Sequence, residues 1–428
     1  MRRRVPLAPI STARQLPRPA ELRELVRFRR PRLRPTERRL NAALTVRDLR
    51  RAATRTTPRA VFDYVDGAAE EEITAARNVA AYRRVTFCPD ALSSVADPDP
   101  GVDLLGRRIA LPLVLAPTGY TRMMHHHGEA AVARVAGHVG IPYTLSTVGS
   151  TSIPDVRAAA PGADLWFQLF LTADPRVNEE LLAQAEDAGY STLLLTVDTA
   201  VSGMRLRDVV NGLTIPPTLT ARTVVDMARF PGWLLAKLTT PGITFAVLGS
   251  AVQGNPTPGE VASLMFDPGM DLTALDWVRR RWRGPLLVKG VTTPDSARRI
   301  MARGADGVVV SNHGGRQLDR SAATLDVLPA IRQAVGADAT VLIDGGILHG
   351  QDIVAARALG ADAAMIGRAY LYGLMAGGQD GVLRACEILA EEYQRCMQLL
   401  GVRRSADLGR QHVAFRPHGG GDHPGVPA

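Results

Sequence analysis

Short apolar runs alternate with longer segments of helical periodicity along the chain from about residue 111. Brief apolar runs bounded by turn residues are typical of buried parallel strands, and apolar residues three and four positions apart are typical of amphipathic helices. Segments 128–140 and 294–304 have the length and spacing of crossover helices. The strand-like runs are Leu113–Ala116, Tyr143–Ser146, Leu165–Phe170, Thr192–Val197, Pro285–Val288, Gly307–Val310, Thr340–Ile343 and Ala363–Ile366.

This alternation predicts an α/β protein built as a (β/α)8 TIM barrel. A doubly wound sheet is the competing architecture, but no GxGxxG fingerprint follows the first predicted strand. Two short helices are expected over 44–65 as an N-terminal helical extension, with Thr45 capping the first and Pro58 opening the second. A packing helix is expected over 382–400, so that the barrel domain covers residues 44–410.

The connection after the fourth predicted strand is much longer than an ordinary strand–helix connection. It forms an insertion over 199–275 that contains a segment, 219–238, rich in Leu, Met, Phe and Trp. Long insertions after barrel strands lie over the active-site mouth. We interpret this one as a lid or substrate-access segment. A membrane-touching interfacial helix and an oligomer contact are alternatives that the sequence alone does not separate.

Positive charge is concentrated at the N-terminus. The net charge is +9, and residues 1–40 carry 13 Arg and 3 Glu, which leaves 38 basic and 39 acidic residues elsewhere. Residues 1–43 are therefore predicted to be a basic, flexible tail that could be drawn to an anionic membrane surface, with nucleic acid a less favoured partner. A second flexible tail, rich in Gly, His and Pro, is expected over 411–428.

Cysteine usage and hydropathy suggest where the protein resides. The three cysteines form no CxxC pair, which argues against a disulfide scaffold or a cysteine zinc site. No apolar stretch has the length of a spanning helix, and no apolar region follows the first arginines as in a signal peptide. We expect a cytoplasmic protein, with peripheral contact at the inner face of the membrane as the alternative.

Residues with catalytic potential follow the predicted strands, where barrel enzymes place their active sites. His313 follows the sixth strand and suits a general base, and Arg316 suits a carboxylate clamp. Asp198 follows the fourth strand and could orient His313. Lys289 ends the fifth strand, and the Asp344-Gly345-Gly346 and Gly367-Arg368 segments follow the last two, whose loops often bind phosphate. This set suits a phosphate-bearing cofactor beside a small acid.

The segment Ser-Asn-His-Gly-Gly-Arg-Gln-Leu-Asp at 311–319 resembles the signature of the FMN-dependent 2-hydroxy-acid oxidases and dehydrogenases, a family that includes glycolate oxidase, L-lactate dehydrogenase and mandelate dehydrogenase. Similar motifs are FDY at 62–64, APTG at 116–119, WFQ at 166–168, TVDT at 196–199, VKG at 288–290 and IGR at 366–368. The resemblance covers 44–408. It implies an FMN-binding barrel, often a homotetramer, that oxidises an L-2-hydroxy acid to the 2-keto acid and passes electrons to a quinone, another carrier or O2.

The resemblance also implies residue roles. His313 would be the base and Asp198 its partner, while Arg316 and Arg205 would clamp the substrate carboxylate with a hydrogen bond from Tyr64. Lys289 would lie near flavin N1 and the C2 carbonyl. The implied cofactor residues are Pro117, Thr118, Gly119, Ser146, Gln168, Thr196 and Ser311 for the FMN wall, and Asp344, Gly345, Gly346, Gly367 and Arg368 around the phosphate.

The sequence departs from the family pattern at two positions. Phe170 stands where the family usually has a substrate-side Tyr, which removes a hydroxyl from the site. Leu348 stands where the family usually has a phosphate-binding Arg, so Arg368 is expected to hold the phosphate alone, with His349 near. Gly119 matches the mandelate dehydrogenase rather than the oxidases, which usually have Ala, and favours a dehydrogenase.

Two alternatives to simple hydroxy-acid oxidation remain open. One is a flavoprotein of the same fold acting on a specialised or peptide-derived metabolite, and the other is a surface-docked protein with little hydroxy-acid activity. The histidines at 125–127 resemble a metal site, but consecutive side chains before a helix are expected to diverge. We therefore predict no metal there, and expect Glu129 to stabilise the start of the helix that follows.

Overall fold

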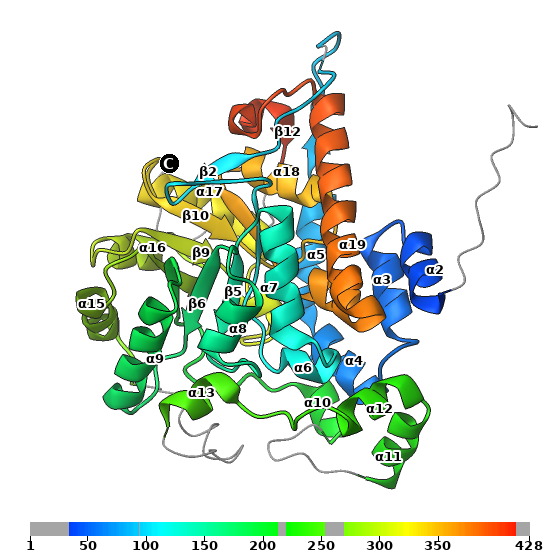
Figure 1. Cartoon of the computed structure of the whole chain (residues 1–428). Coiled ribbons are helices and arrows are strands. Elements are labelled where there is room, and N and C mark those ends of the chain that lie inside the picture. Colours follow the sequence, from blue (N-terminus) through cyan, green and yellow to red (C-terminus); the bar gives the residue numbers. More distant parts are fainter. Residues whose placement is uncertain (1–33, 94, 213–219, 253–268, 417–428) are drawn as a thin grey trace, which may run out of the picture.

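The computed structural model describes residues 34–93, 95–212, 220–252 and 269–416. Eight parallel strands form a closed barrel surrounded by helices, which confirms the predicted (β/α)8 architecture (Figure 1). The barrel order is β10-β11-β4-β5-β6-β7-β8-β9. The strands are β4 (Leu113–Leu115), β5 (Tyr143–Ser146), β6 (Leu165–Leu169), β7 (Thr192–Thr196), β8 (Leu286–Val291), β9 (Gly307–Val310), β10 (Thr340–Ile343) and β11 (Ala363–Ile366), each overlapping a predicted run.

The barrel strands are apolar on both faces because each face packs against protein. The barrel interior is filled by side chains that include Val114, Trp166, Leu194, Leu287 and Val309, all at most 1% exposed. The hairpin of β2 (Val102–Leu104) and β3 (Arg107–Ile109) contributes to the same interior cluster. Because side chains fill the interior, a functional site is expected outside it, at the carboxyl ends of the barrel strands.

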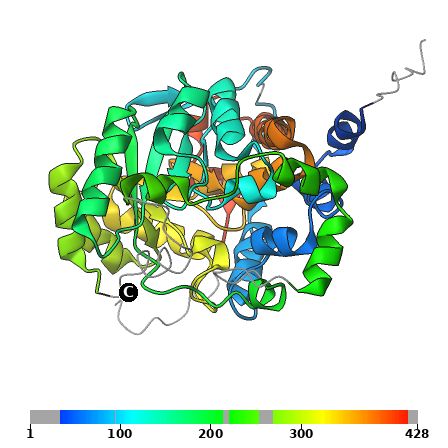
Figure 2. The ribbon, with the colours of Figure 1, turned by 60° about the horizontal axis from the view of Figure 1, so that its bottom comes forward.

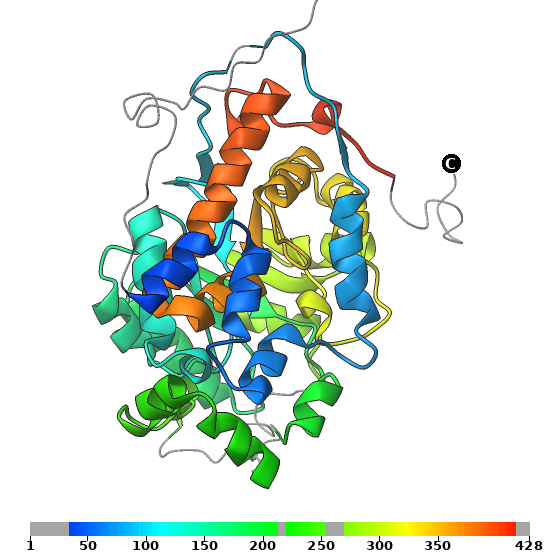
Figure 3. The ribbon, with the colours of Figure 1, turned by 90° about the vertical axis from the view of Figure 1, so that its right-hand side faces the viewer.

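The outer helices begin where the sequence supplies N-caps. Ser152, Asp174, Asp271 and Thr293 each accept a backbone N–H at the start of their helix. These barrel helices are α7 (Gly128–Val139), α8 (Ile153–Ala159), α9 (Pro175–Asp187), α15 (Leu272–Arg281), α16 (Pro294–Met301), α17 (Thr324–Val335), α18 (Gly350–Ala358) and α19 (Arg368–Leu400). Helix α19, orange in Figure 3, includes the predicted helix over 382–400.

The N-terminal extension consists of α2 (Pro35–Ala42), α3 (Val46–Ala53), α4 (Arg59–Asp66) and α5 (Ile73–Arg83). Thr45 caps α3 through a capping box with Asp48, as expected from the sequence, and α4 begins one residue after Pro58. Helix α3 packs against α19, and α5 packs against α17 and the turn that follows β9.

The folded part extends beyond both predicted tail boundaries. Helix α2 lies inside the segment predicted as a tail, because Leu40 is buried and Arg39 Nε donates to the Ala376 carbonyl at 2.7 Å. At the other end, β12 (Val413–Ala414) pairs with β1 (Thr86–Phe87). The rest of the predicted tails, 1–33 and 417–428, lies outside the described residues.

The insertion after β7 contains α10 (Leu206–Val210), α11 (Ala221–Ala228), α12 (Pro231–Leu238) and α13 (Ala246–Ala251). These helices lie along one side of the barrel mouth, seen in Figure 2 in green. Trp233 Nε1 of α12 donates to the Met123 carbonyl of α6 (Thr121–Met124) at 3.0 Å, which ties the insertion to the barrel. Among the described residues, no helix has both the length and the hydropathy required to cross a bilayer.

Candidate active site

A cavity of about 1260 Å³ opens at the carboxyl ends of the barrel strands. Its walls come from the strand-end loops, from α3–α5 and from the first part of the insertion. Most of the predicted site residues line it: Tyr64, Pro117, Thr118, Gly119, Ser146, Gln168, Phe170, Thr196, Arg205, Lys289, His313, Arg316, Asp344, Gly345, Gly346, Gly367 and Arg368. Asp198 and Ser311 lie behind this surface and support it.

His313 and Asp198 form a base–carboxylate pair. His313 Nδ1 lies 3.1 Å from Asp198 Oδ1, which leaves Nε2 for a ligand in the cavity. Burial would raise the pKa of Asp198, but His313 and then Lys289 hold it below its ordinary value. His313 has a left-handed backbone, with φ of 57°, because Gly314 and Gly315 continue the tight turn after β9. An ionised Asp198 stabilises the imidazolium that forms when His313 accepts a proton.

Two arginines converge on Tyr64. The Arg316 guanidinium lies 5.1 Å from the Tyr64 ring centroid, and that of Arg205 lies 6.0 Å from it. Arg316 is anchored by hydrogen bonds from Nη1 to the carbonyls of Tyr64 at 2.7 Å and Gly67 at 3.0 Å. Burial and the charge of Arg205 lower the pKa of Arg316 to about 10. Two partly desolvated cations facing one space favour an anionic ligand there.

Lys289 supplies a buried positive charge to the cavity wall. Its Nζ lies 3.1 Å from Asp344 Oδ2 and donates to Ser311 Oγ at 3.0 Å. Burial would lower the pKa of Lys289, but Asp344 and Asp198 raise it, so the ammonium stays charged. Ser311, predicted on the FMN wall, is instead fully buried, and its Oγ also accepts the His313 backbone N–H at 3.1 Å.

The wall carries polar atoms that have no partner among the described residues. Gln168 Oε1 accepts a hydrogen bond from Ser146 Oγ at 2.8 Å, which leaves Gln168 Nε2 unpaired. Thr196 Oγ1 and Asp344 Oδ1 are also buried and unpaired. Buried polar atoms are normally satisfied. Donors and acceptors arrayed beside a buried ammonium fit the edge of an isoalloxazine ring, so the residues present fit FMN.

The predicted phosphate end has backbone donors but a different side-chain arrangement from the one expected. Gly345 and Gly346 have φ of 92° and 85°, and a Cβ on Gly346 would lie 2.5 Å from the Asn78 carbonyl carbon, so this loop requires glycine. That Arg368 holds the phosphate stays a prediction; its three guanidinium nitrogens also donate to the carbonyls of Val65, Gly67 and Gly314 at 2.8–3.0 Å. Its backbone N–H belongs to the open first turn of α19.

His349 also lies away from the place expected for it. Its Nδ1 faces Glu392 Oε1 at 3.4 Å, and it lines a small adjoining cavity rather than the main one. Of the two side chains that the sequence suggested for the phosphate end, Arg368 therefore lines the main cavity and His349 does not.

Two residues singled out in the sequence, Phe170 and Gly119, line the expected wall. The Phe170 ring lies nearly parallel to that of His313, at 6.5 Å between centroids, so an apolar ring replaces a hydroxyl beside the base. A Cβ on Gly119 would lie 2.6 Å from Val148 Cγ2, which gives this glycine a packing reason in addition to its expected proximity to the flavin.

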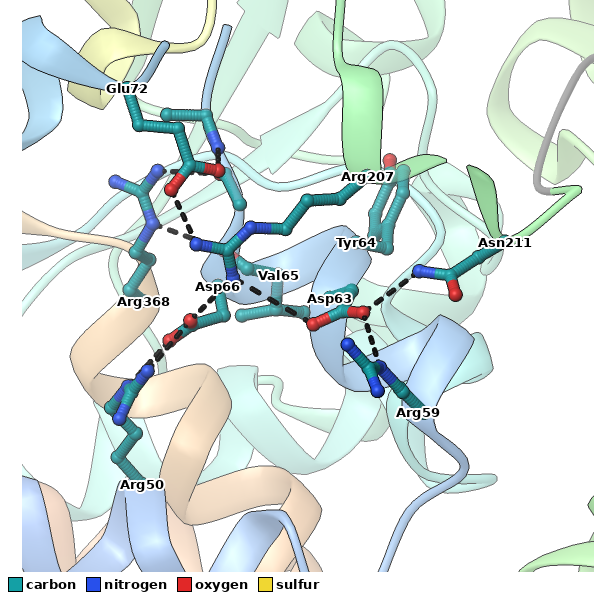
Figure 4. Close-up of polar contacts among 12 residues, drawn as sticks. Arg50, Arg59, Asp63, Tyr64, Val65, Asp66, Glu72, Arg207, Asn211 and Arg368 are labelled. Atoms are coloured by element: carbon teal, nitrogen blue, oxygen red, sulfur yellow. Dashed lines mark hydrogen bonds and ion pairs between the residues drawn. The ribbon is translucent and has the colours of Figure 1, made fainter. Parts of the chain in front are cut away.

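An ionic cluster that sequence reasoning missed joins the insertion to the N-terminal extension (Figure 4). Arg207 of α10 lies 3.0 Å from Asp66 and 3.7 Å from Asp63 of α4, and also pairs with Glu72. Arg50 of α3 makes a bidentate pair with Asp66 at 2.5 and 2.8 Å. Burial would raise the pKa of Asp66, but the hydrogen bond from Arg50 leads the contacts that hold it below its ordinary value.

Three amide side chains whose contacts the sequence did not predict hold the catalytic loop, which is the segment 311–319 after β9. Gln317 Nε2 donates to the carbonyls of Asp198 at 3.0 Å and Val201 at 2.9 Å, which joins the catalytic loop to the start of the insertion. Asn312 and Asn78 exchange hydrogen bonds at 2.8 and 2.9 Å, which fix α5 against the same loop. Gln317 and Asn312 lie in the signature segment, but nothing in the local sequence pairs them with these distant partners.

The histidines at 125–127 correct one expectation. Their side chains do not diverge: their potential ligand atoms all lie within 4.8 Å of one another. They converge because the three residues turn between α6 and α7. Burial, followed by the charges of its neighbours, lowers the pKa of His125 to about 3. Glu129 is buried in the first turn of α7, as expected near a helix start, and accepts hydrogen bonds from Ser150.

Comparison with known proteins agrees with this geometry. The model of the FMN-dependent dehydrogenase family matches residues 53–415. A putative L-lactate dehydrogenase of Mycobacterium tuberculosis is 47% identical over 400 residues, covering 94% of this chain and 96% of that protein. An L-lactate dehydrogenase of Caulobacter vibrioides is 41% identical over 374 residues, covering 86% and 97%. A crystal structure of the monotopic membrane protein (S)-mandelate dehydrogenase superposes with a TM-score of 0.84 at 34% identity, covering 87% and 100%.

The fold and the site thus define a flavin-dependent oxidoreductase with a TIM-barrel core. The chain belongs to the FMN-dependent dehydrogenase family, and it is an FMN enzyme that oxidises the CH–OH group of a hydroxy acid.

Proposed function

We propose that this protein oxidises an L-2-hydroxy acid with a compact apolar or aromatic substituent to the 2-keto acid, and passes the electrons to a quinone or a similar carrier. The convergence of Arg316 and Arg205 on Tyr64, beside His313, supports this proposal most directly. The relatives named L-lactate dehydrogenase and (S)-mandelate dehydrogenase support the same substrate class.

Each group then has a definite task. Arg316 and Arg205 hold the carboxylate, and Tyr64 donates a hydrogen bond to it. His313 accepts the proton of the 2-hydroxyl at Nε2, and Asp198 stabilises the resulting imidazolium. Lys289 keeps a positive charge at the cavity wall, where it stabilises developing negative charge. Bound FMN supplies the two-electron acceptor for this oxidation.

An apolar side of the cavity supports a substituent of this kind. The rings of Tyr120 and Phe245 meet edge to face at 4.4 Å between centroids, and Phe170 lies beside His313. Met123, Val148 and Ile243 also line this cavity. Such a wall favours lactate-sized or aromatic substituents over charged ones.

The test is the anaerobic visible spectrum of the purified protein, recorded before and after separate additions of lactate, glycolate, mandelate and a long-chain 2-hydroxy acid. Bleaching of the flavin bands by lactate or mandelate is expected. A yellow protein that none of the four acids bleaches would overturn this substrate class and favour a specialised or peptide-derived substrate.

Phe170→Tyr sharpens the assignment. Restoring a hydroxyl in a site with little water adds a hydrogen bond of about 1.4 kcal/mol, so the reduction rate with the best acid is expected to rise roughly tenfold. Phe167→Tyr is not a suitable control because Phe167 is buried in the core. The matched control for Phe170→Tyr is Phe245→Tyr, which adds the same hydroxyl elsewhere on the cavity wall.

The acceptor is tested in the same samples. Gly119 is the residue that favours a dehydrogenase, so readmitted air should reoxidise the reduced enzyme slowly and a soluble quinone should reoxidise it quickly. Fast peroxide formation in air would overturn this part of the proposal and leave the substrate assignment intact.

We also propose that the insertion touches a membrane surface. Exposed apolar side chains gather on α10–α12: Met204, Leu206, Val209, Val210, Val224, Val225, Leu235 and Leu238, from the insertion and its first turn. Several exposed apolar residues on neighbouring short helices indicate an interaction surface. The related (S)-mandelate dehydrogenase is described as a monotopic membrane protein, which supports this role.

Vesicle sedimentation tests the membrane contact. Val225→Glu combined with Leu238→Glu should release the protein from vesicles containing anionic lipid, whereas Leu399→Glu, an exposed leucine on α19, should not. Equal binding by the unaltered protein, the double variant and the Leu399→Glu variant would contradict the proposal. The homotetramer implied by the family resemblance also stays a prediction, to be tested by light scattering.

A further inference from the structure

The phosphate end of the cavity has few cationic side chains that are free to bind the phosphate of FMN. An FMN phosphate carries close to two negative charges near neutral pH. Leu348 replaces the family arginine after β10, and the Arg368 guanidinium already binds three backbone carbonyls. The backbone N–H groups of the glycine loops remain, but they carry only partial charge.

Arg47 approaches this end from a different part of the fold. It lies in the first turn of α3, which packs against α19. Its side chain lines the main cavity together with Gly346 and Leu348. It also lines the adjoining cavity of about 270 Å³, again with Gly346 and Leu348. Arg47 is therefore placed beside the loop from which the family arginine is missing.

The other cationic side chains on the cavity wall already have partners. Arg50 and Arg207 pair with Asp66, and Lys289 pairs with Asp344. Arg205 faces Asp208 at 3.6 Å, and Arg316 binds two backbone carbonyls. In the part of the chain that the structure describes, Arg47 has no hydrogen bond or ion pair.

The electrostatics of the neighbouring loop agree with this placement. The hydrogen bond with Glu392 raises the pKa of His349, and the charge of Arg47 opposes that rise. The Arg47 guanidinium thus lies within electrostatic range of the loop that carries Gly346, Leu348 and His349.

We propose that Arg47 binds the FMN phosphate and takes the place of the arginine that is absent at position 348. A guanidinium suits this role because it forms two parallel hydrogen bonds to phosphate oxygens. The phosphate then links the N-terminal helix α3 to the loop after β10. This inference rests on the FMN-dependent family assignment and is independent of which hydroxy acid the enzyme oxidises.

The test is a comparison of FMN with riboflavin, which lacks the phosphate. Apoprotein is prepared from the holoenzyme, and quenching of flavin fluorescence gives the Kd of each ligand. Arg47→Ala should weaken FMN binding about 10- to 100-fold, as expected for the loss of a charged hydrogen bond, and leave riboflavin binding unchanged. The release rate of FMN from the diluted holoenzyme should rise in parallel.

Arg51→Ala is the matched control. Arg51 lies on the same helix, pairs with Asp48 at 3.4 Å and does not line either cavity. Its loss removes the same charge from α3, so it should leave both Kd values within about twofold, the usual range for surface substitutions. A loss of FMN affinity in both variants would show a long-range charge effect and overturn the proposal.

A rescue variant excludes a merely structural role. Leu348→Arg, introduced into the Arg47→Ala protein, should restore most of the FMN affinity, because it returns the cation to the loop itself. Arg47→Lys should retain part of the FMN affinity. Unchanged FMN binding in Arg47→Ala, or an equal loss of FMN and riboflavin binding, would overturn the assignment. Failure of the unaltered protein to bind FMN at all would instead contradict the family assignment.

Discussion

The two halves of the cavity wall are built in different ways. The half formed by strand ends carries His313 and Lys289, which pair with Asp198 and Asp344 at 3.1 Å. The half formed by the extension and the insertion carries Arg50 and Arg207, whose side chains are partly exposed while that of their partner Asp66 is buried. The groups proposed to react are held by the barrel core, whereas the helices that enclose them are joined by ion pairs.

This difference predicts where substitutions matter most. Charges desolvated inside the barrel act at short range in a low-dielectric environment, so each is worth far more than an exposed pair. Substitutions on the strand-end half should therefore change chemistry by orders of magnitude. Substitutions on the helical half should change binding by small factors.

The largest effect is expected for His313→Gln. A glutamine keeps a polar side chain in the cavity but cannot accept the substrate proton, so kcat should fall by about 100- to 10,000-fold. FMN should stay bound, because the wall residues are unchanged, and the visible spectrum checks this. His138→Gln, an exposed histidine on α7, is the control and should be fully active. An active His313→Gln enzyme would remove the base assignment.

The second-largest effect is expected at the two arginines proposed to hold the substrate carboxylate. One of them comes from each half of the wall. Arg316→Met removes a buried cation anchored by Tyr64 and Gly67, so kcat/KM should fall about 100-fold or more. Arg205→Met removes an arginine that Asp208 already partly neutralises at 3.6 Å, so the loss should be smaller. Steady-state kinetics with the best acid measure both. Equal losses would mean that the two halves contribute alike.

The strand-end half was also the more predictable from the sequence. His313, Arg316 and Asp198 could be located because strand ends converge in a barrel and because the signature segment is continuous. The Arg207 cluster could not, because it joins residues more than a hundred positions apart that have no local pattern. Nor does the sequence show that the Arg368 guanidinium also donates to carbonyls that only the folded extension brings near.

A third prediction concerns stability against pH. The pKa of Asp198 is below its ordinary value in the folded protein because His313 and Lys289 outweigh the effect of burial. A depressed carboxyl pKa stabilises the fold above the unfolded-state pKa of about 3.9, and this stabilisation is lost as the pH falls through the folded-state pKa. The free energy of unfolding should therefore fall more steeply below about pH 4 in the unaltered protein than in Asp198→Asn.

Urea denaturation at a series of pH values measures this slope. In a His313→Gln background the difference made by Asp198→Asn should shrink, because directly paired residues are energetically coupled. Parallel curves for all four proteins would show that the pair contributes no pH-dependent stability.

The smallest effect is expected for Arg207→Met on the helical half. Its pairs with Asp66 and Glu72 are partly exposed, and such pairs contribute roughly 0.2–1 kcal/mol each. Loss of the cluster should loosen α10 and move Arg205, which lies two positions earlier, so KM should rise by a few-fold while kcat stays nearly constant. Arg229→Met, an exposed arginine after α11, is the control and should leave both constants unchanged. A large fall in kcat for Arg207→Met would show that the helical half takes part in the chemistry, which would break the division of the wall.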